Sequence, residues 1–157
     1  MDLTNYFKNV SDSLFGEGRF YEVTAQELYE GFRTSVDFTD WGLVLERYEI
    51  SFGNNGGDNV QKYKHGAFSI VKDISYQNAA ERKQCEIQAE ALADQVLAKL
   101  HKDRIQVKAL FGFDIGKVQC YFTQFPKRQT ATGIRVEFTI NHANTLKIDK
   151  KLWKSWE

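Results

Sequence analysis

The sequence predicts an α+β fold, in which a long amphipathic helix packs across one face of a mainly antiparallel sheet. Apolar residues recur every three to four positions from about Asn78 to about His101, which is typical of a helix with one buried face. Apolar and polar residues alternate in 41–52, 118–123 and 133–141, as expected of half-buried strands, and 66–74 is expected to form a further strand. One long helix combined with such strands favours a layered α+β architecture.

The N-terminal part is expected to contain two short helices. Residues 2–15 have apolar side chains at helical spacing, and glycines follow that end the helix. A second helix is expected from Thr24, because Glu27 stands three residues later, at the second position of a capping box. The apolar side chains of the first segment are Leu3, Tyr6, Phe7, Val10 and Leu14.

The next two strands are expected to form an antiparallel hairpin. In residues 41–52, four apolar residues share one parity, and Glu46 interrupts that pattern: Val44, Tyr48, Ile50 and Phe52. The glycine- and asparagine-rich segment 53–66 is interpreted as a mobile hairpin loop, because Gly and Asn tolerate positive φ angles.

The long helix begins at a capping-box-like pair, Asn78 and Glu81, and is followed by two more strands. The clearer of these has inward apolar positions Ile134, Val136, Phe138 and Ile140. The predicted order is therefore α-α-β-β-α-β-β, followed by a C-terminal arm at 145–157 that contains Trp153 and Trp156.

Length and composition limit the class of protein. A chain of 157 residues suits a single domain, here 1–157. The formal net charge is +0, so the whole chain has no electrostatic attraction for nucleic acid. The N-terminus lacks the pattern of a secretory signal, and no apolar run is long enough to cross a bilayer. These features predict a protein made in the cytosol without membrane contact.

No motif predicts catalysis, a metal site or a cofactor. The segment 53–66 lacks the GK[ST] of a phosphate-binding loop, and Lys62 stands where a calcium loop requires glutamate. The three histidines have no spacing typical of metal ligands or of a catalytic triad. Cys85 and Cys120 both fall on predicted inward faces, which favours a structural role as small buried side chains. We therefore expect no enzymatic activity.

Two surface patterns are candidates for partner binding. The basic and aromatic cluster Lys62, Tyr63, Lys64 and His65, together with Trp153 and Trp156 of the arm, could contact a protein partner or nucleic acid. Glu86, Glu90 and Asp94 form an acidic ridge along the long helix. The ridge is interpreted first as a solvated face and second as an interface with a basic patch of another subunit.

The order of the elements carries a resemblance. A helical N-terminus precedes two strands with a long polar loop, the helix AERKQCEIQAEALADQVLAKL follows, and the strand GIRVEFTINHANTL leads into an aromatic tail. In this order, and in the strand 133–140, the chain resembles bacteriophage tail-completion (tail-terminator) and head–tail joining proteins.

The resemblance implies a structural subunit without catalytic residues, which forms an oligomeric, commonly hexameric, ring at the tail end or the head–tail junction. Its partners would be further copies and other tail or head proteins, in the virion or the host cytoplasm. A nucleic-acid accessory role stays open. So does a small-ligand-binding or enzymatic domain with an apolar pocket between helix and sheet, for which the polar groups would be Tyr48, Tyr121 or His142.

Overall fold

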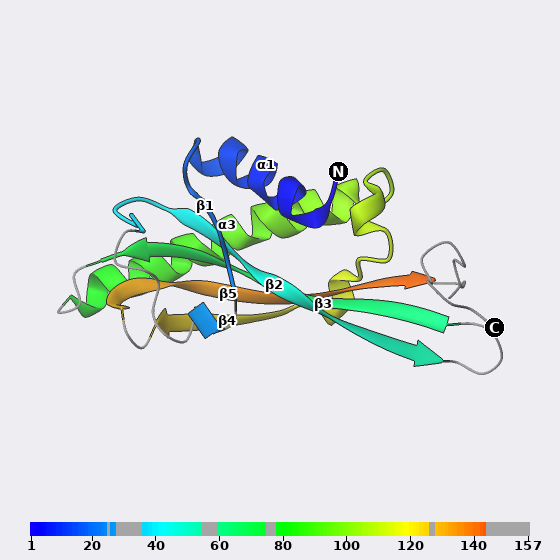
Figure 1. Cartoon of the computed structure of the whole chain (residues 1–157). Helices are drawn as coiled ribbons and strands as arrows, with labels where there is room; N and C mark the ends of the chain where they lie inside the picture. The colour runs from blue at the N-terminus through cyan, green and yellow to red at the C-terminus, as the bar shows by residue number, and fades with distance from the viewer. Residues whose placement is uncertain (25, 28–35, 55–59, 75–77, 126–127, 144–157) are drawn as a thin grey trace, which may run out of the picture.

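The computed structural model describes residues 1–24, 26–27, 36–54, 60–74, 78–125 and 128–143. Within these residues, two helices and two short 3-10 helices accompany a five-stranded sheet (Figure 1). In chain order the elements are α1 (Leu3–Phe15), β1 (Phe20–Val23), β2 (Gly42–Asn54), β3 (Val60–Asp73), α3 (Ala79–Asp103), η1 (Lys108–Leu110), η2 (Ile115–Lys117), β4 (Gln119–Phe125) and β5 (Arg128–Ala143). The α+β class is confirmed.

The sheet is mixed, so the expectation of a mainly antiparallel sheet is corrected. Its strand order is β1-β2-β3-β5-β4, and β1 pairs parallel to β2, whereas the other neighbouring pairs are antiparallel. The predicted element order is also wrong, because it lacks β1. This strand has only four residues, too few for a recognisable alternation. The sequence does not predict its parallel pairing either, since the relative direction of β1 and β2 depends on the path of the segment that connects them.

The two helices begin as the sequence indicates. The Asn78 side chain accepts a hydrogen bond from the Glu81 backbone N–H at the start of α3, and Asp2 caps α1 in the same way. Thr24 and Glu27 form the predicted reciprocal capping box, with Thr24 N–H donating to Glu27 Oε2 at 2.8 Å. Most of the second predicted helix, from residue 28, lies outside the described residues.

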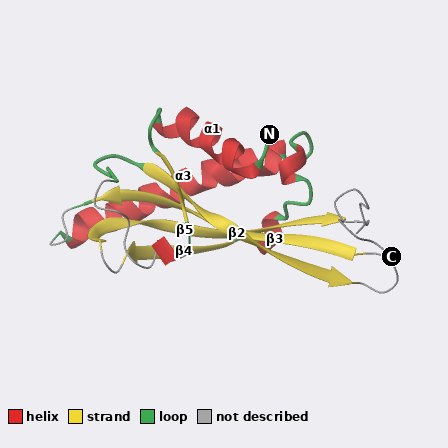
Figure 2. Cartoon of the chain, in the orientation of Figure 1, coloured by secondary structure: helices red, strands yellow, loops and turns green. Residues whose placement is uncertain are grey.

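Both described helices cover the same face of the sheet (Figures 1 and 2). One hydrophobic cluster joins Phe7 of α1 and Leu100 of α3 to Phe68 of β3 and to β5. The predicted inward residues of the last strand are all buried: Ile134, Val136, Phe138 and Ile140. A smaller cluster lies apart from this core and includes Phe38 and Val44. The packing of the long helix across one face is therefore confirmed.

A β-bulge in β2 changes which residues of this strand point to each face of the sheet. Glu46 pairs with Ala67 and Glu49 pairs with His65, so two β2 residues lie opposite Gly66 alone. Because one additional residue shifts the alternation, Val44 points to one face and Ile50 to the other. The prediction that they share a face is wrong.

The segment between β2 and β3 is shorter than expected. Residues 53–54 continue β2, and residues 60–66 belong to β3. The antiparallel hairpin itself is confirmed by the register between the two strands. Residues 55–59 and the predicted arm at 145–157, with Trp153 and Trp156, lie outside the described residues.

The two cysteines differ in exposure. Cys85 is buried in the face of α3 that packs on the sheet, as predicted, whereas Cys120 of the edge strand β4 is exposed. The expectation of a buried Cys120 is corrected, because an edge strand has only one neighbour to shield it. None of the described helices combines the length and the apolar character that a membrane span requires.

We predict that Gly133→Ala destabilises the fold. A Cβ atom at Gly133 would lie 1.8 Å from the Ile70 carbonyl oxygen, so the pairing of β3 with β5 would have to shift. The expected loss is about 3 kcal/mol of the free energy of unfolding, measured by urea denaturation.

Gly116→Ala is the matched control, since the nearest atom to its Cβ would be the Asp114 carboxylate at 3.3 Å. Equal urea midpoints for the two variants would contradict the steric explanation.

Candidate functional site

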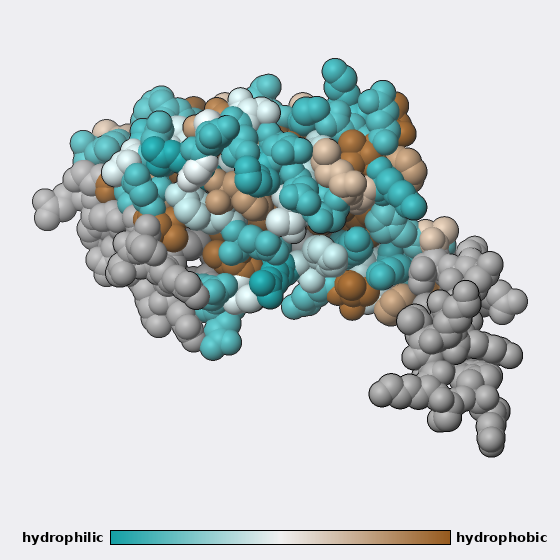
Figure 3. Space-filling model, turned by 45° about the horizontal axis from the view of Figure 1, so that its top comes forward, coloured by the Kyte–Doolittle hydropathy of each residue, from teal (hydrophilic) through white to brown (hydrophobic). Residues whose placement is uncertain are grey.

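The end of the β2–β3 hairpin has exposed apolar side chains. In Figure 1 these strands continue past α1 and α3. Because of the bulge, three large side chains of β2 point to the helix-side face at a place that no described helix covers. Their exposed fractions are 37% for Tyr48, 48% for Ile50 and 55% for Phe52. Figure 3, which views the molecule from the helix side, shows that hydrophobic side chains reach the surface in places among polar ones.

Two lysines lie on the same face as these apolar side chains. Lys64 Nζ is 4.8 Å from the centre of the Tyr48 ring, and Lys62 Nζ is 5.9 Å from that of Phe52. Both distances fit cation–π contacts. Neither lysine forms an ion pair with another described residue. We call Tyr48, Ile50, Phe52, Lys62 and Lys64 the hairpin face.

His142 of β5 borders the hairpin face, directly opposite Lys62 in the strand register. Its partial burial, together with the positive charges of Lys64 and Lys62, lowers the pKa of His142 below its usual range. The imidazole is therefore neutral at neutral pH, and the positive charge of this surface comes from the two lysines.

The predicted four-residue cluster is divided between the two faces of the sheet. Tyr63 and His65 point away from the hairpin face, and their rings stack at 6.1 Å between centres. His65 Nε2 is 2.8 Å from Ser51 Oγ, and His65 Nδ1 is 3.2 Å from Thr139 Oγ1. Strand alternation explains the division, because neighbouring residues of a strand point in opposite directions.

The distance between Ser51 and His65 is that of a nucleophile and its general base, but the surroundings of His65 do not fit this role. The second ring nitrogen meets the neutral hydroxyl of Thr139 rather than a carboxylate that would stabilise a charged imidazole. All three side chains are also clear of the pocket described below. The contact is best explained as a cross-strand hydrogen-bond chain that supports the hairpin.

The acidic ridge lies along α3 as predicted. Glu86 is half-buried, whereas Glu90 and Asp94 are exposed, and none of the three forms an ion pair within the described part of the chain. Burial, followed by the negative charges of Asp94 and Glu90, raises the pKa of Cys120. The ridge therefore lies close to the edge strand β4.

Exposed apolar side chains accompany these carboxylates. Ile87 precedes Glu90 by one helical turn and is 52% exposed, and Phe122 on the helix-side face of β4 is 55% exposed. We call Glu90, Asp94, Ile87 and Phe122 the acidic face. It combines negative charge with apolar area, as the hairpin face combines positive charge with apolar area.

A separate pocket of about 550 Å³ lies between the end of α1, the start of β2 and α3. Its lining residues are Leu14, Phe15, Asp40, Trp41, Gln88, Ala91 and Leu92. The polar groups expected for a ligand pocket do not line it: Tyr48, Tyr121 and His142. Asp40 and Gln88 supply its polar groups instead, a combination that sequence spacing does not reveal because three separate segments meet there.

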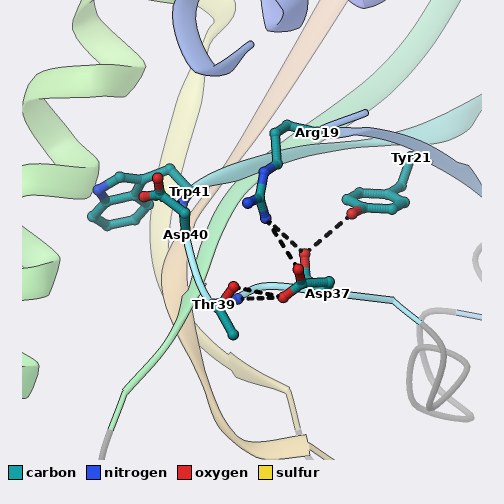
Figure 4. Close-up of polar contacts among 6 residues, drawn as sticks. All are labelled: Arg19, Tyr21, Asp37, Thr39, Asp40 and Trp41. Carbon is teal, nitrogen blue, oxygen red and sulfur yellow. Dashed lines mark hydrogen bonds and ion pairs between the residues drawn. The ribbon is translucent and has the colours of Figure 1, made fainter. Parts of the chain in front are cut away.

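Asp37 holds the chain segment that leads into this pocket (Figure 4). Its backbone carbonyl accepts hydrogen bonds from Arg19 Nη1 at 3.2 Å and from the Tyr21 hydroxyl at 3.1 Å. The Thr39 N–H and hydroxyl donate to its Oδ1 at 2.8 and 2.7 Å. The bonds from Arg19 and Tyr21 fasten the segment before Trp41 to the start of β1, and the Thr39 bonds order the segment itself, so together they hold the pocket rim in place.

Glu46, the charged residue that interrupts the apolar pattern of β2, pairs with a residue that is far away in the sequence. Arg135 of β5 donates to Glu46 from Nε at 2.6 Å and from Nη2 at 2.9 Å, and it also contacts Glu137. The Glu46 side chain is only 9% exposed. The hydrogen bonds to Glu46, opposed by burial and supported by Glu137, raise the pKa of Arg135. The pair stabilises the face of the sheet opposite the helices.

The described residues contain no group of three or more His, Cys, Asp or Glu side chains placed to hold a metal ion. Burial raises the pKa of the Cys85 thiol to about 11, so at neutral pH this side chain is a thiol rather than a nucleophilic thiolate. Within the part of the chain that the structure describes, three features are candidates for function: the hairpin face, the acidic face and the pocket.

We predict that Arg135→Met lowers the free energy of unfolding by about 3 kcal/mol, because Glu46 then stays buried without its partner. Urea denaturation measures the change. The double variant E46M/R135M should be closer to the original stability, since no buried charge is left unpaired. Arg47→Met is the control. Arg47 is 70% exposed, and its ion pair with Glu22 is long, at 3.7 Å, so its loss should cost little. Equal effects of R135M and R47M would contradict this account.

No protein-family model, curated protein sequence or solved structure matches the chain. The surfaces and the pocket described above are therefore the observations that bear on function.

Proposed function

We propose that the protein is a structural assembly subunit of a phage or phage-like particle, and that it forms an oligomeric ring at the tail end or the head–tail junction. Self-association is inferred from the exposed apolar side chains of the hairpin face. The assignment to a phage particle comes from the resemblance in element order. In this proposal the protein has no catalytic turnover and works in the virion, or in the host cytoplasm before assembly.

The hairpin face has the character of an interface rather than of a solvent-exposed strand end. Tyr48, Ile50 and Phe52 extend the face that forms the hydrophobic core elsewhere in the sheet. Contiguous exposed apolar residues of this kind commonly mark binding surfaces. Aromatic side chains are also enriched at the centres of protein interfaces. A partner that covers this face would complete the burial that α1 and α3 begin.

The edge strand β4 supports the same proposal. It pairs with β5 on one side only, and its neighbouring side chains Tyr121 and Phe122 are exposed on opposite faces. Native proteins usually protect edge strands with charges, proline or a covering segment. Two exposed aromatic residues on this edge strand are consistent with an interface between copies.

We predict that the protein forms oligomers and that Ile50→Ser with Phe52→Ser reduces them to single chains, because this change removes apolar area from the hairpin face. Size-exclusion chromatography with light scattering over a wide concentration range measures the mass. The control variant I105S/I115S alters residues that are 72% and 44% exposed but lie outside this face. A single-chain mass for the wild-type protein throughout, or equal losses in both variants, would exclude the proposed role of this face.

The pocket favours a second candidate function, the binding of a small ligand. It is lined by Trp41 and apolar side chains together with Asp40 and Gln88, a combination that suits a ligand with one polar end.

We predict for this candidate that a compound in a metabolite panel raises the melting temperature of the wild-type protein but not that of Ala91→Phe, whose ring fills the pocket. Ala80→Phe is the control, because Ala80 is exposed on the same helix and does not line the pocket. If no compound raises the melting temperature, or if A91F keeps the shift, the pocket is not a ligand site.

A further inference from the structure

We propose that the hairpin face of one copy docks on the acidic face of the next copy. This inference rests on the proposed self-assembly and specifies its contact. Lys62 and Lys64 would meet Glu90 and Asp94 while the apolar side chains of both faces pack together. The occupant of the hairpin face is therefore a second copy of this chain.

Charge complementarity is the first argument. The hairpin face has two lysines, and Glu90 and Asp94 are exposed carboxylates on one side of α3. None of these four charges has an ion-pair partner among the described residues. Complementary charges at an interface steer association and fix its orientation. Each face supplies the charge that the other lacks.

Apolar complementarity is the second argument. Phe52 is beside Lys62 on one face, and Ile87 and Phe122 accompany the carboxylates on the other. A contact built from charge alone would be weak and screened by salt. An apolar centre with surrounding charges has the usual anatomy of a protein interface.

The position of the two faces determines the type of assembly. The hairpin end projects beyond the helices, whereas Glu90 and Asp94 are on the middle part of α3, toward β4 (Figure 1). The faces of one copy therefore serve different neighbours. An interface that joins two unlike surfaces repeats from copy to copy, and it gives a ring when the rotation closes.

Nucleic acid is a less suitable occupant of the hairpin face. Binding of single strands relies on bases that stack on exposed aromatic rings. Here the lysine ammonium groups lie over the rings of Tyr48 and Phe52, where a base would stack. The chain also has no net positive charge that would attract a polyanion.

Charge exchange tests the contact. The variants K62E/K64E and E90K/D94K each bring like charges together, so each should weaken self-association about a hundredfold. The quadruple variant restores opposite charges and should recover the wild-type mass. An equimolar mixture of the two double variants should also recover it, because every contact then joins opposite charges. Sedimentation velocity over a concentration series measures the masses.

The control is K108E/K117E, which makes the same change of net charge as K62E/K64E at two exposed lysines elsewhere. It should assemble like the wild-type protein, and circular dichroism should show all variants folded. If the wild-type protein stays a single chain, both the assembly function and this contact are excluded. If it assembles but the double variants assemble equally well, or if neither the quadruple variant nor the mixture recovers the mass, this contact is excluded and self-assembly stands.

A binding measurement separates the nucleic-acid alternative. Fluorescence anisotropy with a labelled single-stranded oligonucleotide should show no difference between the wild-type protein and K62E/K64E. If the wild-type protein binds the oligonucleotide, and K62E/K64E loses this binding while keeping its assembled mass, the hairpin face is a nucleic-acid surface and the proposal is overturned.

Discussion

The additional residue in β2 opposite Gly66 is the constraint on which the surface of this protein depends. Before the bulge, Leu43 and Leu45 point into the core beneath the helices. After it, the even-numbered residues take over the helix-side face. Opposite the bulge, the ring of Phe138 packs against Gly66, where a Cβ atom would come within 2.7 Å of that ring. A regular strand would have turned Ile50 and Phe52 to the opposite face of the sheet.

The charge of Glu46 is tolerated because Arg135 pairs with it. Glu46 is the last residue of β2 before the irregularity, and it points away from the core toward Arg135. A buried carboxylate costs free energy unless it is paired, and the two hydrogen bonds from Arg135 supply that pairing. The opposite face of the sheet thus combines a small apolar cluster with a partly buried ion pair, while the helix side holds the main core.

The surfaces left after folding are of two unlike kinds, one basic and apolar, the other acidic and apolar. In the proposed assembly, this separation on the molecule would join different patches of successive copies rather than identical patches. The pocket beside Trp41 is independent of both surfaces, because its residues come from α1, α3 and the segment before β2.

The sequence by itself determined the elements whose signals are local. The capping residues Asn78 and Thr24, the stripe of α3 and the alternation of β5 all appear in the structure as predicted. The acidic ridge was likewise visible, since helical spacing places its members together. These predictions succeed because each depends on residues a few positions apart in one regular element.

The tertiary structure alone decided which side chains meet and which stay exposed. The parallel pairing of β1, the bulge after Glu46 and the division of Lys62 and Lys64 from Tyr63 and His65 depend on the register between strands. The partner of Glu46 is 89 residues away in the sequence, and the exposure of Cys120 follows from its place on an edge strand. Such features arise from pairing between distant segments, so no local pattern in a single sequence specifies them.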